Sequence, residues 1–182
     1  SIVTLKNISS ATIIEGLTIS GASSGNYGIF IENASPVIKN SHIKNNYAGI
    51  KIAGNSMPDI NHNIFSGNNT GGAIIHNGAV GGYSIDHNTF LNNGITAGVA
   101  TILLDSNFPN SPVTIKNNIF IGGAIGVYEA NTAFNFILDN NLFYNQSEAY
   151  LKRISTIYNN VSAINDLSNA AKNIVGDPAL EL

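Results

Sequence analysis

Carboxylate, basic and aromatic side chains recur in short segments that begin with glycine. The carboxylates form our candidate catalytic set, Glu32, Asp105 and Glu129. The candidate substrate-binding residues are Phe30, Lys51, His76 and Tyr128. Paired carboxylates perform acid–base chemistry on glycosidic bonds, and aromatic rings beside them offer flat faces to a sugar. This mixed acidic, basic and aromatic strip is therefore the best candidate for a binding groove.

The glycine-led segments must position these side chains. They cover residues 28–31, 49–52, 72–75, 98–104 and 126–128. Successive side chains of a strand point to opposite faces, so alternation separates a core face from an outer face. The residues expected to point inward are Ile29, Ile31, Ile50, Ile52, Ala73 and Ile75. Those expected to point outward include Phe30, Lys51 and Ile74.

A second pattern, six residues long, repeats along most of the chain. It consists of an aliphatic residue, two variable residues, a fourth residue that is usually asparagine, one more variable residue, and then Phe or Ile. Six segments fit it, at residues 14–19, 38–43, 60–65, 85–90, 115–120 and 138–143. They recur every 22 to 30 residues. A period of this size is typical of solenoids, in which each repeat forms one coil.

The fourth position of this pattern is asparagine in four successive repeats. These residues are Asn63, Asn88, Asn118 and Asn141. A side-chain amide has donors and an acceptor, so amides stacked about 4.8 Å apart can bond along the stack. We predict an internal asparagine ladder. The alternative is that asparagine simply suits tight turns and tolerates left-handed dihedrals.

The repeats predict an all-β fold, a right-handed parallel β-helix of about six to seven coils. An antiparallel sandwich also uses short strands, but it does not require one residue type at one register in every coil. We expect a single domain over residues 1–182, with clear coils at about 10–146 and a last coil and exit segment at 147–182. A short helical turn is expected at 164–172. Ser1 opens the chain without Met or a signal peptide, so we expect a piece of a longer chain.

The composition limits the classes of function. Charged residues make up 10% of the chain and the net charge is −3, so no basic field is available to bind nucleic acid. No apolar run is long enough to span a bilayer. Cysteine is absent, which excludes disulfides and thiolate chemistry. Asparagine is abundant, yet the 43% hydrophobic content argues against disorder.

The repeats at residues 36–52 (PVIKNSHIKNNYAGIKI) and 60–69 (INHNIFSGNN) resemble those of the pectate-lyase-like superfamily of parallel β-helices. The similarity covers about residues 10–146, and residues 173–180 (NIVGDPAL) resemble the strand that leaves the solenoid in secreted bacterial members. The resemblance implies an extracellular or cell-surface protein that acts on acidic or neutral polysaccharides. It does not imply one activity, because the same repeat occurs in lyases, hydrolases, epimerases, tailspikes and adhesins.

Metal chemistry has weak support in the sequence. A calcium-dependent lyase needs several convergent carboxylates and a basic residue, and no acidic cluster appears, so Ca²⁺ is considered only for the lyase hypothesis. His62 and His87 share one position of neighbouring repeats, but third and fourth ligands are not apparent. We interpret them as turn residues and predict no metal site. The second position of the repeats forms a column in which the charged residues alternate in sign, and we interpret this column as structural. Its residues are Glu15, Lys39, Asn61, Asp86, Lys116 and Asp139.

Two functions remain open. The first is a secreted bacterial polysaccharide lyase or glycoside hydrolase-like protein that contacts glycan along the glycine-led strands. The second is a non-catalytic carbohydrate-binding or cell-surface structural β-helix. We also expect that uncapped strand edges at the ends of the solenoid could pair with another chain and form an oligomer.

Overall fold

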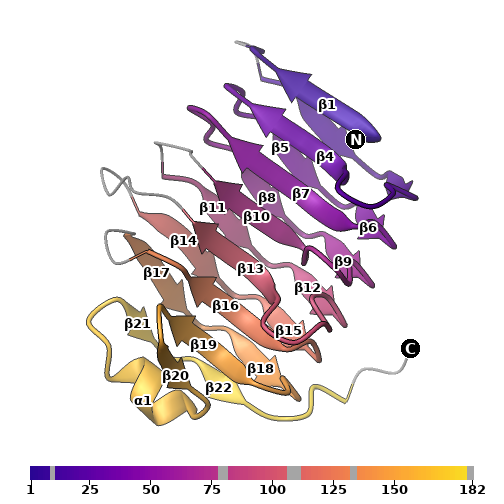
Figure 1. Ribbon diagram of the computed structural model, residues 1–182. Helices are drawn as coiled ribbons and strands as arrows, with labels where there is room; N and C mark the ends of the chain where they lie inside the picture. The colour runs from indigo at the N-terminus through magenta and orange to yellow at the C-terminus, as the bar shows by residue number, and fades with distance from the viewer. Residues whose placement is uncertain (9–10, 78–81, 106–111, 132–134, 180–182) are drawn as a thin grey trace.

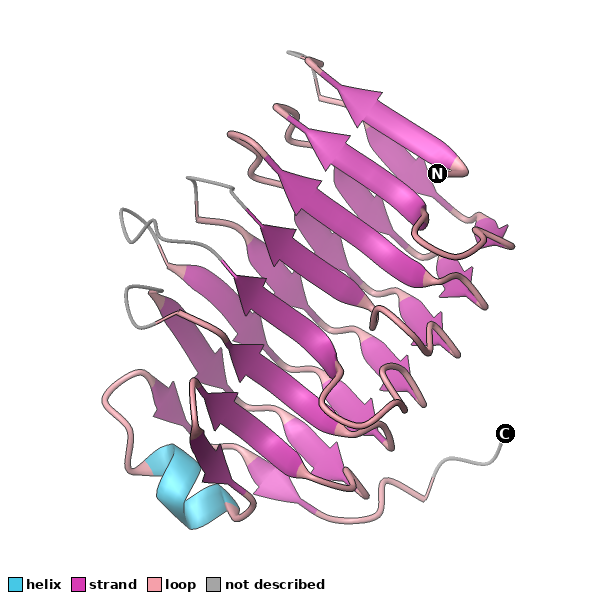
Figure 2. Cartoon of the chain, in the orientation of Figure 1, coloured by secondary structure: helices cyan, strands magenta, loops and turns pink. Residues whose placement is uncertain are grey.

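The chain winds into a parallel β-solenoid of about six turns, which confirms the predicted β-helix (Figure 1). A computed structural model describes residues 1–8, 11–77, 82–105, 112–131 and 135–179. Each coil contributes one strand to each of three sheets, and equivalent strands lie side by side in parallel. Figure 2 shows the three faces and the short loops that join them.

Sheet A contains the longer, glycine-led strands and presents the face with the candidate residues. Its strands are β1 (Val3–Lys6), β4 (Tyr27–Glu32), β7 (Ala48–Ala53), β10 (Ile74–Asn77), β13 (Ala100–Asp105), β16 (Ile125–Glu129), β19 (Ala149–Arg153) and β20 (Thr156–Tyr158). Among the strands of sheet A in the described residues, only β20 runs antiparallel to the strand beside it, β19.

Sheets B and C contain the two short strands of each repeat. Sheet B consists of β2 (Ile13–Glu15), β5 (Val37–Lys39), β8 (Asp59–Asn61), β11 (Ser84–Asp86), β14 (Val113–Lys116), β17 (Phe136–Asp139) and β21 (Ala170–Ala171). Sheet C consists of β3 (Thr18–Ser20), β6 (His42–Lys44), β9 (Ile64–Ser66), β12 (Thr89–Leu91), β15 (Ile119–Ile121), β18 (Leu142–Tyr144) and β22 (Ile174–Val175). We call the turn from sheet B to sheet C the BC corner, and the turn from sheet C to sheet A the CA corner.

The core is a set of columns in which one inward residue per strand stacks on its equivalents. The clearest column belongs to sheet C, where the rings of Phe65, Phe90, Phe120 and Phe143 lie 4.8 to 5.0 Å apart in sequence order. All four are buried. Burial of each ring contributes about 2–3 kcal/mol, so this column is a main source of the solenoid's stability.

The predicted asparagine ladder is confirmed at the BC corner. The Oδ1 of Asn88 accepts from the backbone N–H of Asn63 at 2.9 Å, and its Nδ2 donates to the Oδ1 of Asn118 at 3.1 Å. The same bonds continue through Asn141 to Asn173. Each rung thus satisfies backbone groups that the two-residue turn leaves unpaired inside the solenoid.

A second ladder, which the sequence analysis missed, lies at the CA corner. Its rungs are Asn46, Asn68 and Asn93, all buried. The backbone N–H of Asn46 donates to Asn68 Oδ1, and that of Asn68 donates to Asn93 Oδ1, both at 3.1 Å. The two inner corners of the coil are therefore built on the same amide chemistry.

The inward and outward assignment of β10 is wrong by one residue. Ile74 pairs with Ile50, and Ile75 pairs with Lys51. Ile74 is therefore the buried residue and Ile75 points outward. Aligning Gly72 with Gly49 caused the error, and with a period of two a slip of one residue exchanges the faces.

The helix differs from its expected position. Helix α1 covers Val161–Asn165, with Asn160 as its N-cap, and part of the segment expected to be helical forms β21 instead. Figure 1 shows α1 and β20 at the end of the stack beside β19 and β21. Asn165 Oδ1 accepts from both the backbone N–H and the Nδ2 of Asn173, each at 3.0 Å. The helix thus offers the ladder the amide that a further coil would provide.

Candidate functional site

The outer face of sheet A carries one continuous column of side chains across its strands. Strand pairing aligns them in the order Thr4, Phe30, Lys51, Ile75, Leu103, Tyr128 and Lys152. The structure places Phe30, Lys51 and Tyr128 on the outer face, as expected from the sequence. Their role in binding stays a prediction.

A hollow with three tyrosines opens where this column meets the CA corner. Its lining includes Tyr27, Tyr47 and Tyr128, together with Ile75 and Leu103. The volume is about 320 Å³, within the range of small-ligand sites. We call it the tyrosine hollow. Aromatic rings and aliphatic side chains give it surfaces for the apolar faces of a ligand.

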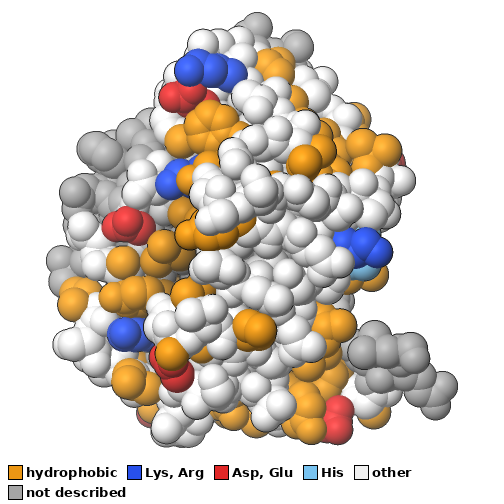
Figure 3. Space-filling model, turned by 45° about the vertical axis from the view of Figure 1, so that its right-hand side comes forward, with side chains coloured by type: hydrophobic (Ala, Val, Ile, Leu, Met, Phe, Trp, Pro, Cys, Tyr) orange, Lys and Arg blue, Asp and Glu red, His pale blue; other side chains and the backbone are white. Residues whose placement is uncertain are grey.

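A more polar hollow adjoins it and shares Tyr47 and Thr70. The other polar side chains of its lining include Ser24, Asn45 and Asn69, and its volume is about 440 Å³. We call it the amide hollow, and the two together the CA cleft. Figure 3 shows that charged side chains are sparse on the face of the molecule that it presents. The cleft therefore combines aromatic walls with uncharged hydrogen-bonding groups.

Two lysines of the column each lie beside a tyrosine ring. Lys51 Nζ is 5.8 Å from the Tyr27 ring centroid, and Lys152 Nζ is 4.8 Å from that of Tyr128. These are cation–π contacts. Burial lowers the pKa of Lys51, although the nearby Asp105 carboxylate acts in the opposite direction.

A long connection forms one wall of the cleft. Strand β12 ends at Leu91 and β13 begins at Ala100, whereas β6 and β7 are separated by only three residues. Gly98 and Val99 from this connection line the tyrosine hollow. The backbone N–H of Gly98 donates to Glu148 Oε1 at 2.9 Å, which ties the connection to a residue just before β19.

The prediction that His76 points outward is wrong. It pairs with Ile52 and Leu104 in an inward column and is 1% exposed. Its Nδ1 lies 2.9 Å from the Tyr83 hydroxyl, and burial raises the pKa of Tyr83. His76 is thus a polar member of the core, and the same one-residue misalignment of β10 led to its predicted outward position.

Glu129 is also inside the solenoid, contrary to the prediction. It pairs with Leu104, is 1% exposed and forms an ion pair with Arg153. Since Tyr128 points outward, the next residue on the strand must point inward. Asp105 lies one residue beyond Leu104 and is exposed, so Asp105 and Glu129 do not face one sugar together.

The remaining candidate carboxylate, Glu32, is on the outer face. Its Oε2 lies 2.6 Å from Lys6 Nζ in an exposed ion pair. Asp105 accepts a hydrogen bond from Asn77 Nδ2 at 3.2 Å. The structure therefore separates the three candidate carboxylates. It leaves the catalytic role of each as a prediction.

Tyr27 and Tyr47 are residues of the cleft that sequence reasoning did not select. A signal for them exists, because each tyrosine follows an asparagine and precedes the glycine of its strand by one or two residues, in Asn26–Tyr27–Gly28 and in the segment NYAG at 46–49. The recurrence places both rings at the CA corner of neighbouring coils.

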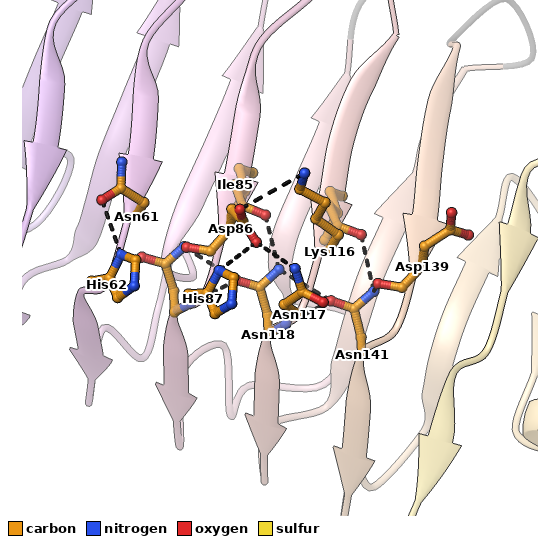
Figure 4. Close-up of polar contacts among 12 residues, drawn as sticks. Asn61, His62, Ile85, Asp86, His87, Lys116, Asn117, Asn118, Asp139 and Asn141 are labelled. Carbon is orange, nitrogen blue, oxygen red and sulfur yellow. Dashed lines mark hydrogen bonds and ion pairs between the residues drawn. The ribbon is translucent and has the colours of Figure 1, made fainter.

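A separate polar cluster lies on the outside of the BC corner (Figure 4). The rings of His62 and His87 stack with centroids 5.0 Å apart and planes 2° from parallel. His62 Nδ1 lies 3.1 Å from Asn61 Oδ1, and His87 Nδ1 lies 2.8 Å from Asp86 Oδ1. In the part of the chain that the structure describes, no group of three or more His, Asp or Glu side chains could hold a metal ion.

Among the described residues, no helix is long and apolar enough to cross a membrane. The family whose model matches the chain is described as a right handed beta helix region, and the match covers residues 1–175. No curated protein and no solved structure matches the chain.

Proposed function

The chain belongs to the right-handed β-helix family, and on that premise we propose that it is a carbohydrate-binding β-helix that holds a polysaccharide in the CA cleft. The observation that carries this proposal is the convergence of Tyr27, Tyr47 and Tyr128 on one hollow. A glycan ligand also supports an extracellular or cell-surface setting, which is part of the proposal.

The chemistry of the cleft supports a sugar over other ligands. Pyranose rings have an apolar face that packs on tyrosine and a rim of hydroxyls that bonds to amides and hydroxyls. The tyrosine hollow offers the first surface, and the amide hollow offers the second. Because coils repeat about every 4.8 Å, a chain of sugars can follow the column of outward residues across several strands.

A second candidate, a lyase acting on uronate polymers, is supported by the position of Lys51, whose Nζ lies 5.8 Å from the ring of Tyr27 in the lining of the tyrosine hollow and whose pKa is lowered by burial. A neutral lysine can remove the proton on the carbon next to the uronate carboxylate while the bond to the leaving sugar oxygen breaks. The products would be an unsaturated sugar and a sugar whose oxygen takes a proton from water. A Ca²⁺ requirement belongs to this candidate only.

The test is a binding titration with a panel of neutral and uronate polysaccharides, with and without Ca²⁺. We expect Tyr47→Ala and Tyr128→Ala each to weaken binding about five- to tenfold, since stacking on one ring contributes about 1–1.5 kcal/mol. The matched control is Tyr144→Ala, which removes a tyrosine from the outer face of sheet C. Equal binding in all three variants would contradict the proposal.

The same mixtures separate binding from catalysis. Unsaturated-product absorbance and new reducing ends are followed over time. Binding with neither product favours the non-catalytic β-helix. Absorbance that is lost in Lys51→Ala and kept in Lys152→Ala favours the lyase.

A further inference from the structure

We propose that His62 and His87 form a two-imidazole site for a divalent transition-metal ion such as Zn²⁺ on the BC corner. From the sequence alone these residues are explained as turn residues. The hydrogen bonds of their rings add what spacing could not show. This site lies away from the CA cleft and is independent of the carbohydrate proposal.

The backbone at both positions does not call for histidine. His62 and His87 have φ values of 54° and 53°, and the equivalent residues Asn40, Asn117 and Asn140 have φ values of 49° to 55°. Asparagine is well suited to this left-handed conformation. Asparagine therefore adopts the same turn in neighbouring coils, and the imidazole ring is the feature that distinguishes His62 and His87 from it.

The tautomers suit metal binding. Asp86 and Asn61 each direct a side-chain oxygen at the Nδ1 of the adjoining histidine. An oxygen acceptor keeps the proton on Nδ1, so the lone pair is left on Nε2. Metal-binding histidines are oriented in this way by a carboxylate or carbonyl oxygen behind them.

The two rings also face the same way. Their planes are nearly parallel, and Figure 4 shows both Nδ1 atoms toward sheet B, which leaves both Nε2 atoms on the opposite side. Both side chains are exposed. Two lone pairs on adjacent coils are therefore offered to solvent in one direction.

The spacing requires an adjustment. In tetrahedral coordination, an ion bound about 2.0–2.1 Å from each nitrogen holds the two Nε2 atoms about 3.4 Å apart. The ring centroids are 5.0 Å apart, so the rings must tilt toward one another. Because they are exposed, the tilt displaces no core side chain, and water completes the coordination. Imidazole ligands select Zn²⁺, Cu²⁺ or Ni²⁺ over Ca²⁺ and Mg²⁺.

The experiment titrates the full chain with Zn²⁺ alone by calorimetry and follows the histidine ring signals by NMR. We expect one site per chain. His62→Asn and His87→Asn should each weaken it at least tenfold. Neither variant should lower the melting temperature of the metal-free protein, because neighbouring coils carry asparagine at this position.

The matched control is His42→Asn, which removes a histidine from sheet C whose Nε2 lies 2.8 Å from Ser66 Oγ. This variant should keep the site. Asn117→His, on the next coil of the same column, should tighten it. Zn²⁺ binding that is unchanged in His62→Asn and His87→Asn, or no Zn²⁺ binding to the parent chain, would overturn the proposal.

Discussion

The BC corner and the CA corner contain the same amide ladder but differ in regularity. At the BC corner every coil turns in two residues, and the ladder bonds run unbroken from Ser41 to Asn173. At the CA corner the ladder has rungs at Asn46, Asn68 and Asn93, and the connections vary in length. The cleft opens at the irregular corner. The regular corner thus stabilises the solenoid, and the irregular one provides room for a ligand.

Asn88→Ala, in the middle of the BC ladder, is the strongest test of whether the BC corner stabilises the solenoid. The change removes the acceptor of the Asn63 backbone N–H and the donor to the buried Ile60 carbonyl. We expect a loss of about 3–5 kcal/mol in the free energy of unfolding, measured with denaturant, because several buried polar groups lose partners. Asn61→Ala, outside the ladder, serves as control and should cost less than about 1 kcal/mol.

Gly123→Asn tests why the CA ladder stops. Gly123 has a φ of 87°, and a Cβ there would lie 2.3 Å from the Asn93 carbonyl oxygen. We expect the new asparagine to destabilise the fold by about 2 kcal/mol or more instead of adding a rung. A rise in the melting temperature would show that the backbone at Gly123 accepts a further rung and that the ladder ends only because the side-chain amide is missing.

Glu148→Gln tests whether the irregular corner serves binding more than stability. The change weakens the bond that holds the Gly98 N–H at the wall of the tyrosine hollow. Because Glu148 is exposed, the free energy of unfolding should change by less than about 0.5 kcal/mol. Polysaccharide affinity should fall severalfold. A large loss of stability with unchanged affinity would show that this connection serves stability and not binding.

The smallest effect is expected from Lys51→Met, measured as stability against pH. Burial lowers the pKa of Lys51 in the folded chain, so at alkaline pH the unfolded chain binds a proton that the folded chain does not. The parent protein should therefore gain stability relative to the variant as pH rises toward the ordinary lysine value of about 10.4. Lys152→Met is the comparison. If the parent protein instead lost stability relative to Lys51→Met as pH rises, the lowered pKa of Lys51 would be contradicted.

The features that could be predicted from the sequence are those that recur at one register in successive coils. Asn63, Asn88, Asn118 and Asn141 share one register, so the BC ladder and the parallel stacking followed from them. The CA ladder was missed because Gly123 stands where the next rung would be. His76 and Glu129 were placed on the wrong face because the length of each glycine-led segment hides which residue pairs with which. Which side chains converge at the cleft depends on that register and on the long connection before β13.

The BC ladder also has an electrical direction. Each Nδ2 donates to the Oδ1 of the following rung, from Asn63 through Asn88, Asn118 and Asn141 to Asn173. The amide dipoles therefore lie head to tail, and each bond polarises the next one in the low-dielectric interior. Asn165 receives the last bond and returns its own Nδ2 to the Asn173 carbonyl at 2.9 Å, which closes the series on itself.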